Sequence, residues 1–251
     1  MDSENSKDWW KPENLEKSEQ ECREIIDLDE LELKSDFGSY RKVLMSGEIK
    51  GSMLEFHNDL MPTEKIKVIS SYLGKERPSY ILDAGCGMGF TTAALAKFYK
   101  GAEVLGVDVS KDAIVFAMNT HKEAKFLSAT ISPDAEILGE FDYIFCIEFY
   151  PFTRNSDAET QVKFIKYFAK QLSKNGAIII YQLWNNPESL SSVINQVIER
   201  LPNLVFTIRR TLHPKLTRFL PKPFSWTANY ILEKIFNKEY SKTILIIQAR
   251  D

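Results

Sequence analysis

The stretch ILDAGCGMGF, residues 81–90, decides the fold, because an apolar run ends there in three glycines separated by single residues. A short apolar run closed by glycine predicts a buried strand followed by a tight turn. The next segment, residues 90–101, has apolar residues on one helical face and a glycine at its end, which predicts a helix. In such a strand–turn–helix unit, Gly85 and Gly87 would let the backbone approach a ligand closely.

The spacing of the glycines restricts the ligand of this turn. A P-loop needs a Lys after its last glycine, and no Lys follows Gly89. A dinucleotide loop needs a glycine at position 90, which is Phe90. Asp108 ends the next apolar run, 19 residues after Gly89, where a carboxylate can accept both hydroxyls of a ribose. The pattern therefore predicts a nucleoside site and gives no support for a bound pyrophosphate.

Strand and helix patterns alternate after residue 75. This alternation predicts an α/β protein with a Rossmann-like, doubly wound sheet of seven strands, helices on both faces and a ligand at the carboxyl ends of the strands. The last two strands lack a regular crossover helix, which allows an antiparallel last strand. The expected strands are 79–85, 103–110, 125–129, 141–147, 177–183, 204–210 and 243–249. The expected helices are 90–101, 111–121 after a Ser110 cap, 157–176 ending at Gly176, and 187–201 with Pro187 in its first turn.

Charge is distributed unevenly along the chain. Residues 1–36 hold 13 Asp/Glu and 5 Lys/Arg, and predict an acidic N-terminal arm. Residues 37–75 predict a helical cap or lid of two or three short helices, and 76–251 a ligand-binding domain with an insertion at 212–240. Residues 208–251 hold 9 Lys/Arg and 3 Asp/Glu. The two ends are either solvated surfaces that face each other, or the basic end is a site for an anionic substrate.

Composition excludes several classes of protein. The net charge of −3 argues against a general nucleic-acid binder. Three distant cysteines without a C-x-x-C spacing predict a reduced, cytoplasmic protein and no metal site. Cys146 is expected to be a small core residue of the fourth strand. The N-terminus is too polar for a signal peptide, and the run AIIIY is too short to span a bilayer, so no integral membrane contact is expected.

Four motifs in order resemble those of the class I S-adenosylmethionine (SAM)-dependent methyltransferases. They are ILDAGCGMGF (81–90), VLGVDVS (104–110), FDYIFCIEFY (141–150) and LSKNGAIII (172–180), and the resemblance covers roughly residues 65–210. It implies an enzyme of class EC 2.1.1 with SAM as cofactor, bound by residues 76–251. It also implies that Asp83, Gly85, Cys86 and Gly87 line the amino-acid end of SAM, with Asp83 near its ammonium group.

The same resemblance implies contacts for the nucleoside end. Asp108 would bind the ribose, and Val109 would flank the adenine. The family often has an acidic residue after the third strand, but this chain has SATI at 128–131. Ala129 and Thr130 would therefore contact the adenine through backbone and hydroxyl groups. Glu148 follows the fourth strand, where the methyl group should face the substrate.

Methyl transfer is an in-line displacement, so the protein mainly positions the nucleophile, and a base is needed only if the nucleophile carries a proton. Glu148 is the first candidate for a base or a substrate-orienting group; the alternative is that it only binds SAM. His57 is a catalytic candidate or a structural residue. Tyr150 either acts on the substrate or packs. Arg154 either binds an anion or is a surface residue beside Asp157.

Three further residues are expected to contact the substrate. Tyr40 and Arg41 belong to the predicted cap, from which a Tyr could close over the methionine part of SAM. His213 belongs to the basic run 209–222, which contains five Lys/Arg and no acidic residue. This run is expected in the connection between the last two strands, where it either recognises phosphate or carboxylate or forms a solvated loop.

The sequence restricts the class of the substrate only in part. The tetrapeptide [DNS]-P-P-[YF] of base-amino methyltransferases is absent, and EFYP stands in its place, which argues against DNA. EFYPFTR weakly resembles methyltransferases of bacterial capsule and surface-sugar modification. We therefore expect methylation at O or N of a small polar, anionic molecule that bears phosphate or sugar. An RNA or protein methyltransferase and a non-catalytic SAM-binding partner protein are the alternatives, and a monomer and a homodimer are both compatible with the sequence.

Overall fold

The computed structural model describes residues 60–74, 77–183, 189–212 and 241–250. Its centre is one seven-stranded sheet of order β3-β2-β1-β4-β5-β7-β6. The strands are β1 (Tyr80–Ala84), β2 (Glu103–Asp108), β3 (Lys125–Ser128), β4 (Phe141–Ile147), β5 (Leu172–Leu183), β6 (Leu204–Leu212) and β7 (Ser241–Ala249). The first five pair in parallel, and β7 runs antiparallel between β5 and β6. The predicted Rossmann-like sheet with an antiparallel last strand is confirmed.

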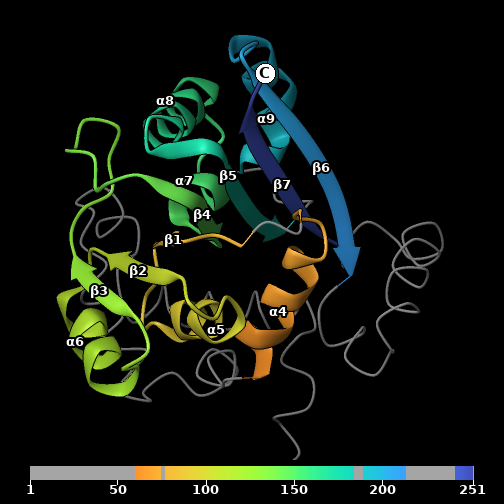
Figure 1. The fold of residues 1–251 in the computed structure, drawn as a ribbon. Helices are drawn as coiled ribbons and strands as arrows, with labels where there is room; N and C mark the ends of the chain where they lie inside the picture. Colours follow the sequence, from red (N-terminus) through yellow and green to blue (C-terminus); the bar gives the residue numbers. More distant parts are fainter. Residues whose placement is uncertain (1–59, 75–76, 184–188, 213–240, 251) are drawn as a thin grey trace, which may run out of the picture.

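Helices cover both faces of this sheet (Figure 1). One face carries α4 (Leu60–Ser70), α5 (Phe90–Phe98) and α6 (Lys111–Thr120), and the other carries α8 (Ala158–Ala169) and α9 (Leu190–Arg200), with the short α7 (Tyr150–Thr153) after β4. Helix α4 lies within the predicted cap at 37–75. The rest of that cap, the arm at 1–36 and residues 213–240 of the insertion lie outside the described residues, so the division into arm, cap and domain stays a prediction.

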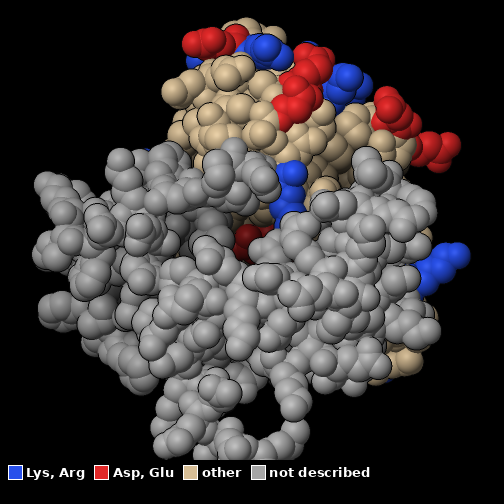
Figure 2. Space-filling model, turned by 180° about the vertical axis from the view of Figure 1, so that it is seen from behind, with Lys and Arg blue, Asp and Glu red and all other residues tan. Residues whose placement is uncertain are grey.

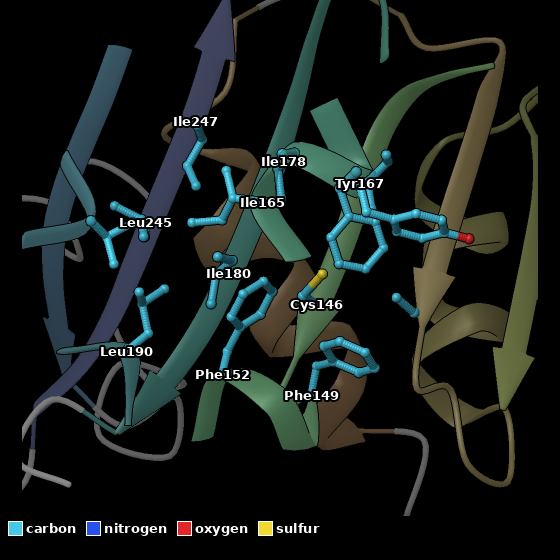
Figure 3. Packing of buried hydrophobic residues seen from close by; sticks show 14 of the residues in the cluster. Cys146, Phe149, Phe152, Ile165, Tyr167, Ile178, Ile180, Leu190, Leu245 and Ile247 are labelled. Atoms are coloured by element: carbon cyan, nitrogen blue, oxygen red, sulfur yellow. The ribbon is translucent and has the colours of Figure 1, made fainter. Parts of the chain in front are cut away.

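Alternating side chains of the central strands fill two cores. On β4, Ile144 and Cys146 join the cluster beneath α8 and α9, whereas Tyr143 and Phe145 join the cluster beneath α4 and α5. Figure 3 shows the first cluster, in which Phe149 and Phe152 from the segment after β4 lie beside Cys146. Cys146 is fully buried, and this burial raises the pKa of its thiol, so its expected role as a core residue is confirmed.

The predicted helix 157–176 is wrong in its second half. Helix α8 ends at Ala169 and β5 already begins at Leu172, with a register shift against β4 before Ala177. A Cβ on Gly176 would lie 3.0 Å from the carbonyl oxygen of Asp142. Gly176 is therefore explained by the close approach of two strands and not by the end of a helix.

Other boundaries differ by a few residues. Helix α5 ends at Phe98, and Gly101 follows in a turn with φ of 96°. Helix α9 begins at Leu190 behind a Ser189 cap, while Pro187 lies outside the described residues. The Ser110 cap of α6 is confirmed, since its hydroxyl accepts the N–H of Ala113 at 3.3 Å. Strand β6 extends to Leu212, so the first two arginines of the basic run belong to a strand at the sheet edge.

Asp142 joins three strands at the amino end of the sheet. Its Oδ2 accepts the N–H groups of Ser79 and Tyr80 at 2.6 and 3.0 Å, and its Oδ1 accepts the Ser173 hydroxyl at 2.6 Å. Partial burial opposes ionisation, but these hydrogen bonds outweigh it and hold the pKa of Asp142 below its usual value. The carboxylate therefore ties the start of β1 and of β5 to β4.

We expect Asp142→Ala to lower the free energy of unfolding at pH 7 by about 1–3 kcal/mol, because three donors lose a charged acceptor. A carboxyl group with a lowered folded-state pKa stabilises the fold above its unfolded value of about 3.9 and loses this contribution as pH falls through the folded value. The difference from wild type, measured by urea unfolding, should therefore shrink below pH 4. The exposed Glu140→Ala is the control, and an equal difference at pH 7 and pH 3 would contradict the role.

Candidate functional site

Polar side chains gather at the carboxyl ends of four neighbouring strands. Asp83 lies near the end of β1, Asp108 ends β2, Glu148 follows β4 and Tyr181 lies near the end of β5. These strands run parallel, so their ends share one edge of the sheet, where open α/β sheets bind ligands. The topology thus brings together Asp83, Asp108 and Glu148, which the sequence predicted as site residues.

The backbone donors of the glycine-rich loop are already engaged within the protein. The N–H groups of Gly85 and Cys86 donate to the Val107 carbonyl at 2.8 and 3.0 Å. The Gly87 N–H donates to Asp108 Oδ2 at 2.8 Å, and the Gly89 N–H to the Cys86 carbonyl at 3.0 Å. A phosphate cradle needs such N–H groups to point at its ligand. The N–H groups of Gly85, Cys86, Gly87 and Gly89 are therefore directed at protein acceptors and not at a phosphate.

Two glycines of the loop are required by packing. Gly85 has φ of 74°, and a Cβ there would lie 2.7 Å from the Phe149 ring. Gly89 has φ of 83°, and a Cβ there would lie 2.7 Å from the Phe126 ring. Packing against Phe149 is thus a second reason for glycine at position 85, and the predicted approach of a ligand to its backbone stays a prediction. Gly89 allows the loop to pack closely against Phe126 and Ala117.

Asp108 fixes the geometry of the loop with both carboxylate oxygens. Oδ2 accepts the Gly87 N–H and Oδ1 accepts the Ser110 N–H, each at 2.8 Å. Each oxygen of an ionised carboxylate has a second lone pair. Asp108 can therefore hold the loop and still accept two hydroxyl groups of a ribose.

We expect Asp108→Asn to destabilise the cofactor-free protein by about 1–3 kcal/mol. The NH₂ group of the asparagine would face the N–H of either Gly87 or Ser110, and that N–H would be left without an acceptor. Urea unfolding without any cofactor measures this effect. The exposed Asp134→Asn is the matched control. Unchanged stability of Asp108→Asn would show that Asp108 does not hold the loop.

Asp83 is a buried carboxyl group with one side-chain hydrogen bond. Only 1% of its surface is exposed, and the Thr92 hydroxyl donates to its Oδ2 at 2.7 Å. Burial raises the pKa of Asp83 to about 7; the Thr92 bond lowers it, the Asp108 charge raises it and the Lys65 charge lowers it. Near neutral pH, Asp83 can thus be either a neutral acid or the carboxylate that an ammonium group would need.

Glu148 has an unusual backbone conformation. Its φ is 52°, in the left-handed region that non-glycine residues seldom adopt, and its N–H donates to the Tyr181 carbonyl at 2.9 Å. Its side chain is exposed, and its charge adds to the effect of burial in raising the pKa of Tyr181. Backbone strain of this kind often occurs at functional sites, and here it sets a carboxylate at the ligand-binding edge.

The strain at Glu148 can be measured with a pair of substitutions. We expect Glu148→Gly to be more stable than Glu148→Ala by about 1 kcal/mol, because glycine adopts positive φ without a Cβ clash. Both variants lose the carboxylate, so their difference reports the backbone alone. Thermal or urea unfolding measures it, and an alanine variant at least as stable as the glycine variant would contradict the strain.

The remaining predicted residues are only partly within the described segments. Tyr150 and Arg154 are half-buried at the two ends of α7, near Glu148 in sequence. Val109 is half-buried directly after β2, and Thr130 is exposed. The Ala129 N–H donates to the Asp108 carbonyl at 3.1 Å, so it is already engaged. The structure does not describe His57, Tyr40, Arg41 and His213.

Sequence reasoning missed three residues of this edge. Thr92 binds Asp83, the Tyr181 ring lies in the cluster beneath α4, and the Lys65 Nζ lies 6.0 Å from the centroid of that ring. Thr92 follows the glycine loop in a helix whose pattern indicates only packing. Lys65 and Tyr181 are far apart in the sequence, so no motif links them.

The described residues show a surface of mixed charge. Where they are visible in Figure 2, basic and acidic side chains are interspersed. Among the described residues, no three His, Cys, Asp or Glu side chains are grouped so that they could hold a metal ion. Within the same segments, no helix has the length and apolar character needed to span a bilayer.

Comparison with known proteins identifies the family. Residues 76–218 match the family described as "Methyltransferase domain". An uncharacterized protein of Rickettsia prowazekii is 32% identical over 123 residues, 45% of this chain and 48% of that protein. The mitochondrial ubiquinone biosynthesis O-methyltransferase of Saccharomyces cerevisiae is 31% identical over 98 residues, 38% of this chain and 31% of that protein. The chain thus matches less than half the length of each of these relatives.

Solved structures share the fold. The plantazolicin methyltransferase BpumL with S-adenosylhomocysteine (SAH) has a TM-score of 0.55 at 17% identity, covering 88% of this chain and 94% of that chain. Magnesium protoporphyrin IX methyltransferase from Synechocystis PCC 6803 with bound SAM has a TM-score of 0.56 at 14% identity, covering 88% and 97%. With the family match over more than half of its residues, the chain belongs to the class I SAM-dependent methyltransferases.

The donor set of the edge fits SAM, the cofactor of this class. SAM carries an ammonium group and a ribose diol but no phosphate. The site offers carboxyl groups at Asp83 and Asp108, beside a loop in which four N–H groups are engaged within the protein. The two carboxyl groups match the ammonium group and the ribose diol of SAM.

Proposed function

We propose that this protein transfers a methyl group from SAM to an oxygen or nitrogen of a small polar, anionic molecule that bears phosphate or sugar. The observation that carries the proposal is the set of carboxyl groups of Asp83, Asp108 and Glu148 at one sheet edge, beside a loop whose glycine N–H groups are bonded within the protein. Bound SAM supplies an activated methyl group on a sulfonium. The protein then has to hold the cofactor, orient the acceptor and take up a proton where the acceptor carries one.

In this proposal, the cofactor lies across the ends of β1 and β2. Asp83 receives the ammonium group of the amino-acid end, near Gly85, Cys86 and Gly87. Asp108 accepts the ribose hydroxyls with the lone pairs that remain on its oxygens. Val109 flanks the adenine. Because the Ala129 N–H is engaged, the side of the adenine near Ala129 is left to the Ala129 carbonyl and the Thr130 hydroxyl.

Glu148 is the proposed base or orienting group. It is exposed, it follows β4 directly, and its strained backbone places it between the ends of β1 and β5. A carboxylate there can accept a hydrogen bond from an acceptor hydroxyl or amine and take its proton as the methyl group is transferred. Tyr150 and Arg154, at the two ends of α7, are the neighbouring candidates for substrate contacts, and the Arg154 guanidinium suits a phosphate or carboxylate.

Three relatives support a small acceptor. Their names refer to ubiquinone biosynthesis, plantazolicin and magnesium protoporphyrin IX. An anionic acceptor is supported by Arg154 and by Arg209 and Arg210, which begin the basic run on the edge strand β6. Capsule or surface-sugar modification, the oligomeric state and a cytoplasmic location stay predictions.

Turnover of SAM to SAH over a panel of small metabolites tests the proposal. We expect turnover with a phosphorylated or acidic member and at least tenfold less with its neutral counterpart. Glu148→Gln should lower kcat at least tenfold while the calorimetric Kd for SAM changes less than threefold, because the amide keeps the shape but cannot take a proton.

The exposed Glu140→Gln is the control for Glu148→Gln. Absence of SAM binding would refute the proposal as a whole. If SAM binds but turnover occurs only with RNA or protein, the acceptor is a polymer and not a small molecule. If SAM binds without turnover on any panel, the chain is better described as a non-catalytic SAM-binding partner protein. An unchanged kcat in Glu148→Gln would remove Glu148 from the chemistry.

A further inference from the structure

Helix α4 brings a lysine to the cofactor edge. Ile66 and Ile69 are fully buried and anchor α4 in the cluster that contains Tyr181. Lys65, adjacent to Ile66, extends over the Tyr181 ring with its Nζ 6.0 Å from the ring centroid. The positive charge of Lys65 also acts on the Asp83 carboxyl. A helix that precedes the glycine loop in sequence thus places a cation near the end of β1.

The described groups that shift the ionisation of Asp83 come from three elements. Thr92 of α5 donates a hydrogen bond, Asp108 of β2 adds a negative charge, and Lys65 of α4 adds a positive charge. The buried Cys146 thiol of β4 also lies within electrostatic reach of Asp83 and is neutral, because burial raises its pKa well above the usual value. Among these described groups, Lys65 alone favours the ionised form by its charge.

The amino-acid end of SAM presents an ammonium and a carboxylate. A neutral acid at Asp83 can only accept a weak hydrogen bond from that ammonium, whereas a carboxylate pairs with its charge. A buried ion pair is favourable only when both charges are matched and hydrogen-bonded. The cofactor would therefore select the ionised form of Asp83, and its own carboxylate would be matched by a nearby cation.

We propose that Lys65 is a positioning residue of the SAM site: its ammonium group favours the ionised Asp83 that receives the cofactor ammonium, so that SAM binding expels a proton from Asp83. This inference rests on the proposed function of the same edge. It adds Lys65 to the site and couples cofactor binding to pH.

The sign of the coupling follows from the state of Asp83. Below its free-site pKa of about 7, Asp83 holds a proton that the complex does not, so binding releases up to one proton. SAM affinity should rise about tenfold per pH unit up to pH 7 and then level off. Removing the Lys65 charge should raise the pKa of Asp83 and therefore raise the pH at which SAM affinity levels off, which is the midpoint of the pH–affinity profile.

Calorimetry of SAM binding in two buffers with different ionisation enthalpies tests the coupling in the full-length protein. At pH 6, we expect the binding heats in the two buffers to differ by the amount that corresponds to release of nearly one proton per SAM. At pH 8.5, we expect the two heats to agree. Equal heats at pH 6 would overturn the inference. If no SAM binds at either pH, the proposed function fails first and the inference fails with it, so the two failures are distinguishable.

Variants on α4 test the part played by Lys65. Lys65→Met should shift the midpoint of the pH–affinity profile upward by at least half a unit, and Lys65→Arg should restore it. Lys67→Met is the matched control, because Lys67 is exposed on the same helix and pairs with Glu64 at 2.7 Å. A purely structural role for Lys65 would weaken binding equally at all pH values, and that result would overturn the assignment.

A measurement without SAM identifies Asp83 as the proton source. Folded Asp83 holds its proton up to about pH 7, whereas unfolded Asp releases it near 3.9, so this residue lowers wild-type stability as pH rises from about 4 to about 7. Asp83→Asn should lack this decline in urea unfolding, whether or not it binds SAM. The same decline in Asp83→Asn as in wild type would exclude Asp83.

Discussion

The site depends on the attachment of the glycine-rich loop to the end of β2. Three successive N–H groups of the loop donate to Val107 and Asp108, and the second oxygen of Asp108 binds the start of α6. These bonds fix the turn between β1 and α5 relative to the neighbouring strand. They also direct these three N–H groups at the protein, so that they cannot point at a phosphate.

The second constraint is the burial of charge at this edge. Asp83 and Asp108 lie on the face beneath α4 and α5, where water is largely excluded. Asp108 has two backbone donors, but Asp83 has a single hydroxyl, and the pKa of Asp83 rises to about 7 as a result of its burial. An edge of this kind suits a ligand that brings its own positive charge, as the ammonium group of SAM does.

The sequence predicted the sheet, its order of elements and the residues at the strand ends. Those predictions rest on local patterns: apolar runs, caps such as Ser110, and the position of Asp108 after its strand. It failed where a residue serves a distant neighbour. Gly176 looks like a helix stop in the sequence but is required by the approach of two strands, and the packing of Gly85 against Phe149 could not be seen in the sequence.

The sequence by itself therefore determined the class of fold and the kind of cofactor, because both follow from motifs of a few residues that act through neighbouring backbone. Only the tertiary structure showed that Lys65 and Tyr181 belong to the same edge as Asp83, and that the loop donors are engaged. The physical reason is that burial and charge act through space. The ionisation of Asp83 is set by its burial and by groups on three other elements, and their proximity exists only after the chain has folded.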